Sequence, residues 1–297
     1  MINISQFNIK YYIFVIVFDL KMYNKLNDML QVEIHKNINT NQGWLINQFE
    51  IFNFTEPFLT EKFIPRQYIS IVFNFRNLPL ILDKLPIQLE PFFVGPIIPQ
   101  AIKLKFQGNM DTFIVACKPT VFSRHFNINL SPREKRSVNL PHAIFYPLWK
   151  SMSDLSSTEE RINFFTNFIN TFHEASYCPD AVDDLYNKII EMGTTTPLKE
   201  IMQDCCATER SLQRNFIRRT GVSPKTMMRI VRLNNLWDKI KNENAIDYQD
   251  LVFDGHYFDQ SHFINDFKAI IGETPNQFFK RNLNIVKMFS GKAEGKI

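Results

Sequence analysis

The side chains in this chain best suited to molecular recognition are arginines four residues apart. In ATERSLQRNFIRRTG, residues 207–221, Arg210 and Arg214 fall on one side of a predicted helix, and Leu212 and Phe216 fall on another. Arginine and glutamine can each form two hydrogen bonds with the edge of a guanine or an adenine. The same stripe is also typical of a solvated helix face, so spacing alone leaves both interpretations open.

The distribution of charge favours a polyanion as the partner. The chain has a net charge of +4, and after residue 193 it holds 16 Lys and Arg against 12 Asp and Glu. Within residues 209–232 the only acidic side chain is Glu209, among seven basic ones. A basic cluster of this kind is the electrostatic pattern expected of a nucleic-acid-binding surface.

An internal repeat separates this stripe from an ordinary surface helix. FDQSHFINDFKAIIGETP repeats the pattern of ATERSLQRNFIRRTGVSP with an offset of 51 residues. Each copy predicts a helix that begins after a capping residue, Thr208 or Asp259, and ends at a glycine, Gly221 or Gly272, able to adopt a positive φ. A second, proline-started helix follows each glycine.

Each copy also follows a predicted short helix, in PLKEIMQDC and in DYQDLVFDGHY. Two short helices joined by a tight turn form a helix-turn-helix unit. Residues 224–241 keep apolar side chains at helical spacing, which predicts one long helix that links the two units.

The segment from about Thr194 to Asn282 resembles the tandem helix-turn-helix domain of the AraC/XylS family of bacterial transcriptional regulators. The resemblance rests on SLQRNFIRRTGVSP, RIVRLNNLWDKI and YFDQSHFINDFKAIIGETPNQFF in that order. It implies that the second helix of each unit enters a major groove, with the two helices about one turn of DNA apart. It further implies double-stranded DNA and RNA polymerase as partners, a homodimer, a small-molecule effector, no cofactor and no enzymatic activity.

The predicted DNA contacts follow from position along these helices. Side chains near the helix N-terminus can reach base edges, whereas more distant donors and cations reach phosphates. The predicted base-reading residues are Arg210, Gln213, Arg214, Gln260, Ser261 and Asn265. The predicted phosphate-binding residues are Thr208, Arg218, Arg219, Lys225, Arg229, His262 and Lys268.

The second copy departs from the family pattern. Ile264 replaces the glutamine of the first copy, Asp266 adds an acidic group, and His256 stands where the family usually has glycine before an aromatic residue. We therefore expect the first unit to carry most of the discrimination between bases. A solvent-facing role without DNA contact is the alternative for His262 and Asn265.

The front of the chain predicts a β-rich domain over residues 1–150. Apolar and polar residues alternate in 68–75 and 102–107, and 113–117 adds a further strand, with prolines and glycines between them. The expected fold class is α+β, with a cupin-like barrel or sandwich followed by an all-α domain over 194–297. Residues 151–193 predict two phenylalanine-rich helices that form either core or a dimer interface.

The same front segments, PRQYISIVFNF, FFVGP and FIVACKP, loosely resemble the β-rich front domain of some family members, although Arg66 and Gln67 depart from its usual acidic-glycine pair. Such a barrel could enclose a small molecule. His35, His125 and His142 show no metal-ligand spacing, so no metal site is expected.

Two other functions remain as alternatives. The front domain could bind a partner protein instead of a small molecule. The chain could also be a DNA-repair methyl-accepting enzyme, but that chemistry needs a four-cysteine metal site, and only Cys117 and Cys178 precede the DNA-binding part. The apolar run at 11–18 is shorter than the roughly 20 residues that span a bilayer, so we expect a soluble, cytoplasmic protein.

Overall fold

The computed structural model describes most of the front and helical regions of the chain. The apolar run at 11–18, the pair Cys205 and Cys206, and most of the helix predicted in DYQDLVFDGHY lie outside the described residues. The described residues are 30–36, 42–55, 58–131, 136–172, 178–193, 195–203, 208–240, 252–253 and 255–279.

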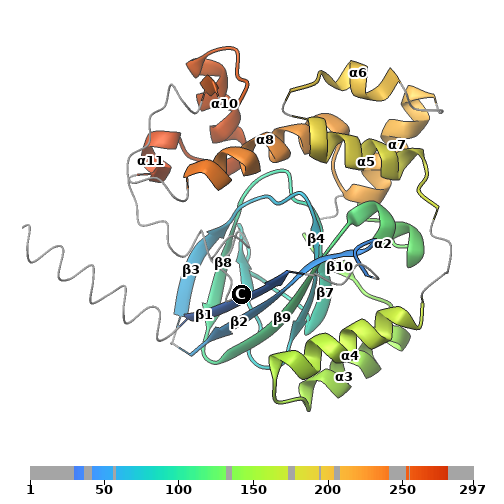
Figure 1. Cartoon of the computed structure of the whole chain (residues 1–297). Helices are drawn as coiled ribbons and strands as arrows, with labels where there is room; N and C mark the ends of the chain where they lie inside the picture. The colour runs from blue at the N-terminus through green and yellow to red at the C-terminus, as the bar shows by residue number, and fades with distance from the viewer. Residues whose placement is uncertain are drawn as a thin grey trace, which may run out of the picture.

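Two antiparallel sheets form the front domain and confirm the predicted β-rich class, although they do not close into a barrel (Figure 1). The six-stranded sheet has the order β1 (Leu30–Lys36), β2 (Ile46–Phe54), β9 (Met110–Cys117), β4 (Ile69–Asn74), β7 (Phe92–Gly95) and β10 (Val138–Asn139). The four-stranded sheet has the order β3 (Phe58–Phe63), β8 (Ile102–Gln107), β5 (Leu80–Leu82) and β6 (Ile87–Gln88).

Strand β4 is more buried than its sequence predicts. The alternation in 68–75 predicts one buried face, but every residue of β4 is buried. Ile71 and Phe73 pack in the main core, whereas Ser70 and Val72 line a cavity between the sheets. Both faces are covered because helices lie on one side of the strand and the second sheet lies on the other.

The helices of the front domain pack against the six-stranded sheet. A capping box formed by Ser157 and Glu160 starts α4, whose Phe165 packs against aromatic rings from β2, β4 and β9. Arg161 of α4 donates two hydrogen bonds to Asp111, at 2.7 and 2.9 Å. These helices are α2 (Pro119–His125), α3 (His142–Ser153) and α4 (Thr158–Asn170).

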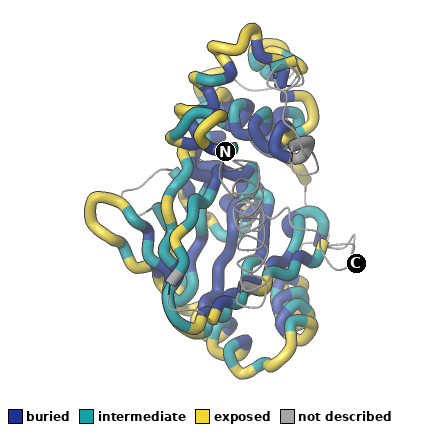
Figure 2. The backbone as a smooth tube through the Cα atoms, turned by 90° about the vertical axis from the view of Figure 1, so that its left-hand side faces the viewer, coloured by how far each residue is buried: buried dark blue, intermediate teal, exposed yellow. Residues whose placement is uncertain are grey.

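Helices α6 and α7 form the first predicted helix-turn-helix unit, and α10 is the described helix of the second unit, on the other side of α8 (Figure 1). Met227 and Ile230 of α8 join the core that contains Phe216, and Trp237 joins the cluster that contains Phe267. The long linking helix is thus confirmed, and Figure 2 shows buried residues continuing from the sheets into these helices. The helices are α5 (Ala181–Met192), α6 (Leu198–Gln203), α7 (Glu209–Thr220), α8 (Pro224–Ile240), α10 (Gln260–Ile271) and α11 (Pro275–Phe279).

Glycine ends both repeated helices, as the sequence predicts. Gly221 follows α7 with φ +89°, and Gly272 follows α10 with φ +82°. His256, which takes the place of the family glycine, also has a positive φ of 50°. No helix among the described residues is long and apolar enough to cross a membrane.

The two glycines predict different costs for the same substitution. Gly272→Ala places a left-handed alanine whose Cβ would lie 3.9 Å from Lys62 Nζ, an ordinary contact, and we expect a loss of about 1 kcal/mol. Gly221→Ala should cost at least about 1 kcal/mol more, because its new Cβ would lie 2.7 Å from the carbonyl oxygen of Leu130. Denaturant unfolding of both variants measures the difference, and equal losses would contradict the close approach at Gly221.

Candidate nucleic-acid interface and cavity

Helix α7 brings its predicted base-reading residues together on one exposed face. Arg210 and Arg214 are exposed, and Gln213 is half-buried between them on the helix surface. The Gln213 side chain donates to a carboxylate oxygen of Glu209 at 3.0 Å, one turn earlier. This face is opposite the apolar face that contains Leu212, so the arginine groups stand clear of the core.

Helix α10 presents a more neutral surface. The Asp259 side chain accepts from the backbone N–H of His262 at 2.6 Å and so caps the helix. The His262 ring lies edge-on to Tyr257, with centroids 5.3 Å apart. The remaining candidates on this helix are all exposed: Gln260, Ser261, Asn265 and Lys268.

Three predicted phosphate contacts remain accessible around the first unit. Thr208 precedes α7 and its side chain makes no capping hydrogen bond. Lys225 is exposed at the start of α8. Arg218 is exposed near the end of α7 and donates to the side-chain oxygen of Asn127 at 3.2 Å.

Arg219 is not a phosphate ligand in this structure, which corrects its sequence-based assignment. Its guanidinium is buried and donates to both oxygens of Asp180, at 2.8 and 2.6 Å, and to Asp183 at 2.5 Å. Its Nε donates to the carbonyl of Thr120 at 3.0 Å. Arg219 thus attaches the end of α7 to α2 and α5. Its position, three residues after Phe216, already places it on the apolar face.

Arg229 has an internal role, while its side chain stays 33% exposed and its phosphate contact stays a prediction. Its Nε donates to Asp266 of α10, and the buried Asp266 carboxylate also accepts from the Tyr257 hydroxyl at 3.2 Å. The guanidinium of Arg232 lies 5.1 Å from the centre of the Tyr257 ring. Arginines of α8 therefore hold the second unit against the linking helix.

Asp180 stays ionised over the whole neutral range. Burial opposes its ionisation, but the backbone N–H of Asp183 and the Arg219 guanidinium outweigh burial and lower the pKa of Asp180 from 3.8 to about 2. A depressed carboxyl pKa contributes stability above the unfolded value, and this contribution is lost as the pH falls from about 4 to about 2. The attachment of α7 is thus insensitive to pH under physiological conditions.

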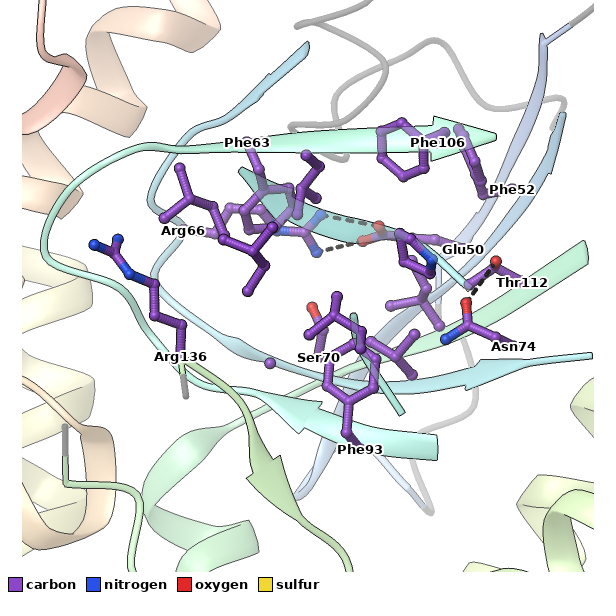
Figure 3. A pocket seen from close by; sticks show the side chains of 18 of the residues that line it. Glu50, Phe52, Phe63, Arg66, Ser70, Asn74, Phe93, Phe106, Thr112 and Arg136 are labelled. Carbon is purple, nitrogen blue, oxygen red and sulfur yellow. Dashed lines mark hydrogen bonds and ion pairs between the residues drawn. The ribbon is translucent and has the colours of Figure 1, made fainter. Parts of the chain in front are cut away.

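A cavity of about 120 Å³ lies between the two sheets, and its wall is mostly apolar. Two buried charged residues, Arg66 and Glu50, point toward one another there (Figure 3). The guanidinium donates two hydrogen bonds to the carboxylate, at 2.9 and 2.6 Å, and lies 4.3 Å from the centre of the Tyr68 ring. Arg136 lies at one end of the cavity.

Sequence reasoning missed the Arg66–Glu50 pair, although it noted Arg66 as unusual. The available signal was Glu50, the one charged residue in the apolar strand INQFEIFNF. A buried carboxylate requires a hydrogen-bonded cation, and Arg66 immediately before β4 is the cation that reaches it. Pairing the two residues needs the register of β2 beside β9 and β4, which the sequence does not supply.

The three histidines considered as metal ligands lie in separate surroundings, two of them aromatic. His142 stacks on Tyr146 with ring centroids 4.7 Å apart, and His125 lies edge-on to Trp44 at 5.8 Å. His35 contacts Glu33 at 3.3 Å on β1. Among the described residues, no group of three or more His, Cys, Asp or Glu side chains could hold a metal ion.

The helical part of the chain matches a known family model. A model described as a helix-turn-helix domain matches residues 196–281, which include both units and the linking helix. This match agrees with the resemblance of this segment to the DNA-binding domain of AraC-type regulators. The matched residues contain α6, α7, α8, α10 and α11.

Comparisons over the whole chain give more distant likenesses. None of the curated protein sequences compared with this chain matches it. A structure of ToxT from Vibrio cholerae is 11% identical, covers 85% of this chain and 98% of that chain, and has a TM-score of 0.45. An unsaturated fatty acid-bound ToxT from Vibrio cholerae is 11% identical, with coverages of 91% and 98% and a TM-score of 0.41. The AraC-like transcriptional activator CuxR is 9% identical, with coverages of 90% and 93% and a TM-score of 0.23.

Neighbouring arginines of α7 should differ sharply in their effect on stability. Arg219→Ala removes the main partner of the buried Asp183 carboxylate, and we expect a loss of about 3 kcal/mol. Arg218→Ala removes an exposed contact and should cost less than about 0.5 kcal/mol. Urea unfolding followed by circular dichroism distinguishes the two variants. Similar losses for both would contradict the buried role of Arg219.

Proposed function

We propose that this AraC-type regulator recognises its DNA site mainly through α7. The exposed face formed by Arg210, Gln213 and Arg214 supports this proposal, because it presents three side chains capable of paired hydrogen bonds to base edges. The face is free of the intramolecular ion pairs that occupy Arg219 and Arg229. It is the single observation on which the proposal depends.

The second helix α10 reads fewer bases in this proposal. Its exposed candidates Gln260, Ser261 and Asn265 can each donate or accept hydrogen bonds, but they bring no cationic charge to the groove. Lys268 and His262 supply contacts to phosphates nearby. In this proposal the first unit discriminates between bases, and the second unit mainly orients the protein on the DNA through phosphate contacts.

Accessible cations around α7 complete the interface. Arg218 and Lys225, together with the Thr208 hydroxyl, are proposed to bind phosphates on either side of the groove. We divide the chain into a sensor at 1–150, a helical segment at 151–193 and the DNA-binding domain at 194–297. RNA polymerase remains a proposed partner on the family resemblance alone.

Base-reading and phosphate-binding arginines should give different signatures in DNA binding. On a site selected from random DNA by the wild-type chain, Arg214→Ala should lose roughly 1 to 3 kcal/mol of specific affinity through a lost bidentate base contact. Arg218→Ala should weaken binding to all sequences alike and lower the slope of log affinity against log salt by about 1.

Fluorescence anisotropy at several salt concentrations measures both effects. Lys36→Ala, an exposed substitution on β1 of the front domain, is the matched control and should leave both quantities unchanged. Undiminished binding of the selected site by Arg214→Ala would remove base reading from this residue.

The front domain is proposed to bind a small effector in the cavity between its sheets. The apolar wall and the buried Arg66–Glu50 pair support an apolar ligand that carries one polar group. The cavity volume of about 120 Å³ suits a ligand with a small apolar part, because an apolar cavity of roughly 150 Å³ accommodates benzene. Arg136 at one end could receive a carboxylate.

Ligand binding predicts a thermal shift that depends on the cavity. Short straight-chain carboxylic acids at saturating concentration should raise the melting temperature of the wild-type chain by several degrees. The alcohols of the same length should raise it less. Ser70→Leu fills the cavity and should abolish the shift. The absence of any shift in the wild type, or an equal shift in Ser70→Leu, would contradict an effector site here.

Dimerisation is proposed to use the exposed surface of α3 and α4. These helices expose three large hydrophobic side chains at the surface of the front domain. They are Ile144, Tyr146 and Phe164, each 37 to 41% exposed. Helix α5 is less suited to this role because it packs against α6, α7 and α8.

A partner-protein role for the front domain remains the second proposal, supported by the same exposed side chains. The methyl-accepting enzyme is less well supported. Burial raises the pKa of the Cys117 thiol, which disfavours the nucleophilic thiolate, and the exposed Cys178 is not part of a cysteine cluster among the described residues.

A further inference from the structure

Both recognition helices end against the front domain. The last carbonyl groups of a helix have no partner within that helix and must find donors elsewhere. The backbone N–H of Leu130 donates to the carbonyl of Arg218 at 2.8 Å, near the end of α7. The backbone N–H of Ala101 donates to the carbonyl of Ile270 at 2.7 Å, near the end of α10. The front domain therefore contacts corresponding ends of the two repeated helices.

The first interdomain contact, at the end of α7, is closely packed. It includes the Leu130–Arg218 hydrogen bond and the buried Arg219 with Asp180 and Asp183. Gly221, at the end of the helix, also lies close to the carbonyl oxygens of Leu130 and Ile97. None of these described residues lines the cavity between the sheets.

The second interdomain contact, at the end of α10, is built on Lys62 of β3. The Lys62 ammonium donates to the carbonyl of Ile271 at 2.9 Å and to the Glu273 carboxylate at 2.8 Å. Its side chain is only 14% exposed, so the ion pair is largely screened from water. Ala101 adds the backbone hydrogen bond to Ile270 beside it.

The residues that follow Lys62 contact the DNA-binding domain and the cavity in turn. Ile64 is buried in the cluster around Phe267, and the carbonyl of Pro65 accepts from the Asn234 side chain of α8 at 3.2 Å. Phe63 and Arg66, by contrast, line the cavity.

The other half of the second contact also adjoins the cavity. Ile98 and Ile102 line the cavity on either side of Ala101. Arg136 lines both the cavity and a groove that passes Lys62 and Glu273. A change in the cavity wall can thus reach the end of α10 through two short stretches of backbone.

We propose that Lys62 and Ala101 are positioning residues for DNA recognition, which set the placement of α10 against DNA, and that the state of the cavity alters this placement while α7 stays fixed. The DNA and ligand parts rest on the proposed function. A ligand in the cavity would contact Phe63 or Arg66. It shifts the equilibrium between two placements of α10 only if it binds one of these placements more tightly than the other.

Amide hydrogen exchange in the full chain tests the placement of α10 directly. The Ala101 N–H reports on the contact at the end of α10, and the Leu130 N–H reports on the contact at the end of α7. Lys62→Ala should speed exchange of the Ala101 N–H by about tenfold and leave the Leu130 N–H within about twofold of wild type. Lys103→Ala is the matched control, since this exposed lysine on the adjoining strand makes no hydrogen bond or ion pair with a described residue through its side chain. Equal changes at both amides, or none at Ala101, would overturn the proposal.

The cavity side is tested with the same two amides and no ligand. Ser70→Leu fills the cavity, and Glu50→Gln weakens the pair with Arg66. Each should change exchange at Ala101 and spare Leu130. The second variant keeps the test valid if the first one does not fold, and thermal melting checks that each variant is folded. Exchange at Ala101 that is unchanged in the folded variants would overturn the coupling to the cavity.

DNA binding gives a readout that a purely structural role would not move. In the wild type, scrambling either half of the selected site should lower affinity. In Lys62→Ala the penalty for scrambling the half contacted by α10 should shrink by about tenfold, while the penalty at the α7 half is retained. An equal reduction at both halves would overturn the proposal. A wild-type chain that binds no DNA sequence specifically would instead refute the proposed function, and the amide exchange would still decide the placement of α10.

Discussion

The carbonyl groups in the last turn of each recognition helix need donors from outside that helix, and the arrangement of the molecule depends on where those donors lie. In this chain the front domain supplies them, through Leu130 at the end of α7 and Ala101 at the end of α10. Because α8 also packs against both units, the two helices are held by one shared helix and by two separate contacts. The DNA-binding surface is therefore defined by the whole chain.

This constraint explains why the basic cluster has two roles. Arginines on the exposed face of α7 remain available to an anionic partner, whereas Arg219 and Arg229 are bound to carboxylates within the protein. Buried ion pairs of this kind contribute geometry more than net stability, because desolvation offsets much of the attraction. Here they fix the end of α7 against α5 and the middle of α10 against α8.

Much of this organisation could be predicted from the sequence, where local rules apply. The repeat predicts both glycine stops and the linking helix, and Ser157 with Glu160 predicts the start of α4. Helical periodicity places Arg219 on the apolar face of α7, whereas the basic residues around it favour a phosphate contact. The burial of both faces of β4 and the pairing of Glu50 with Arg66 depend on sheet order, for which local sequence carries no signal.

The central claim is that two recognition helices held by a common framework bind one stretch of DNA together. Hydroxyl-radical footprinting of the full chain on its selected site tests this most directly. The account predicts two protected stretches on one face of the duplex, centred about ten base pairs apart. A single protected stretch, or protection that does not depend on sequence, would contradict it.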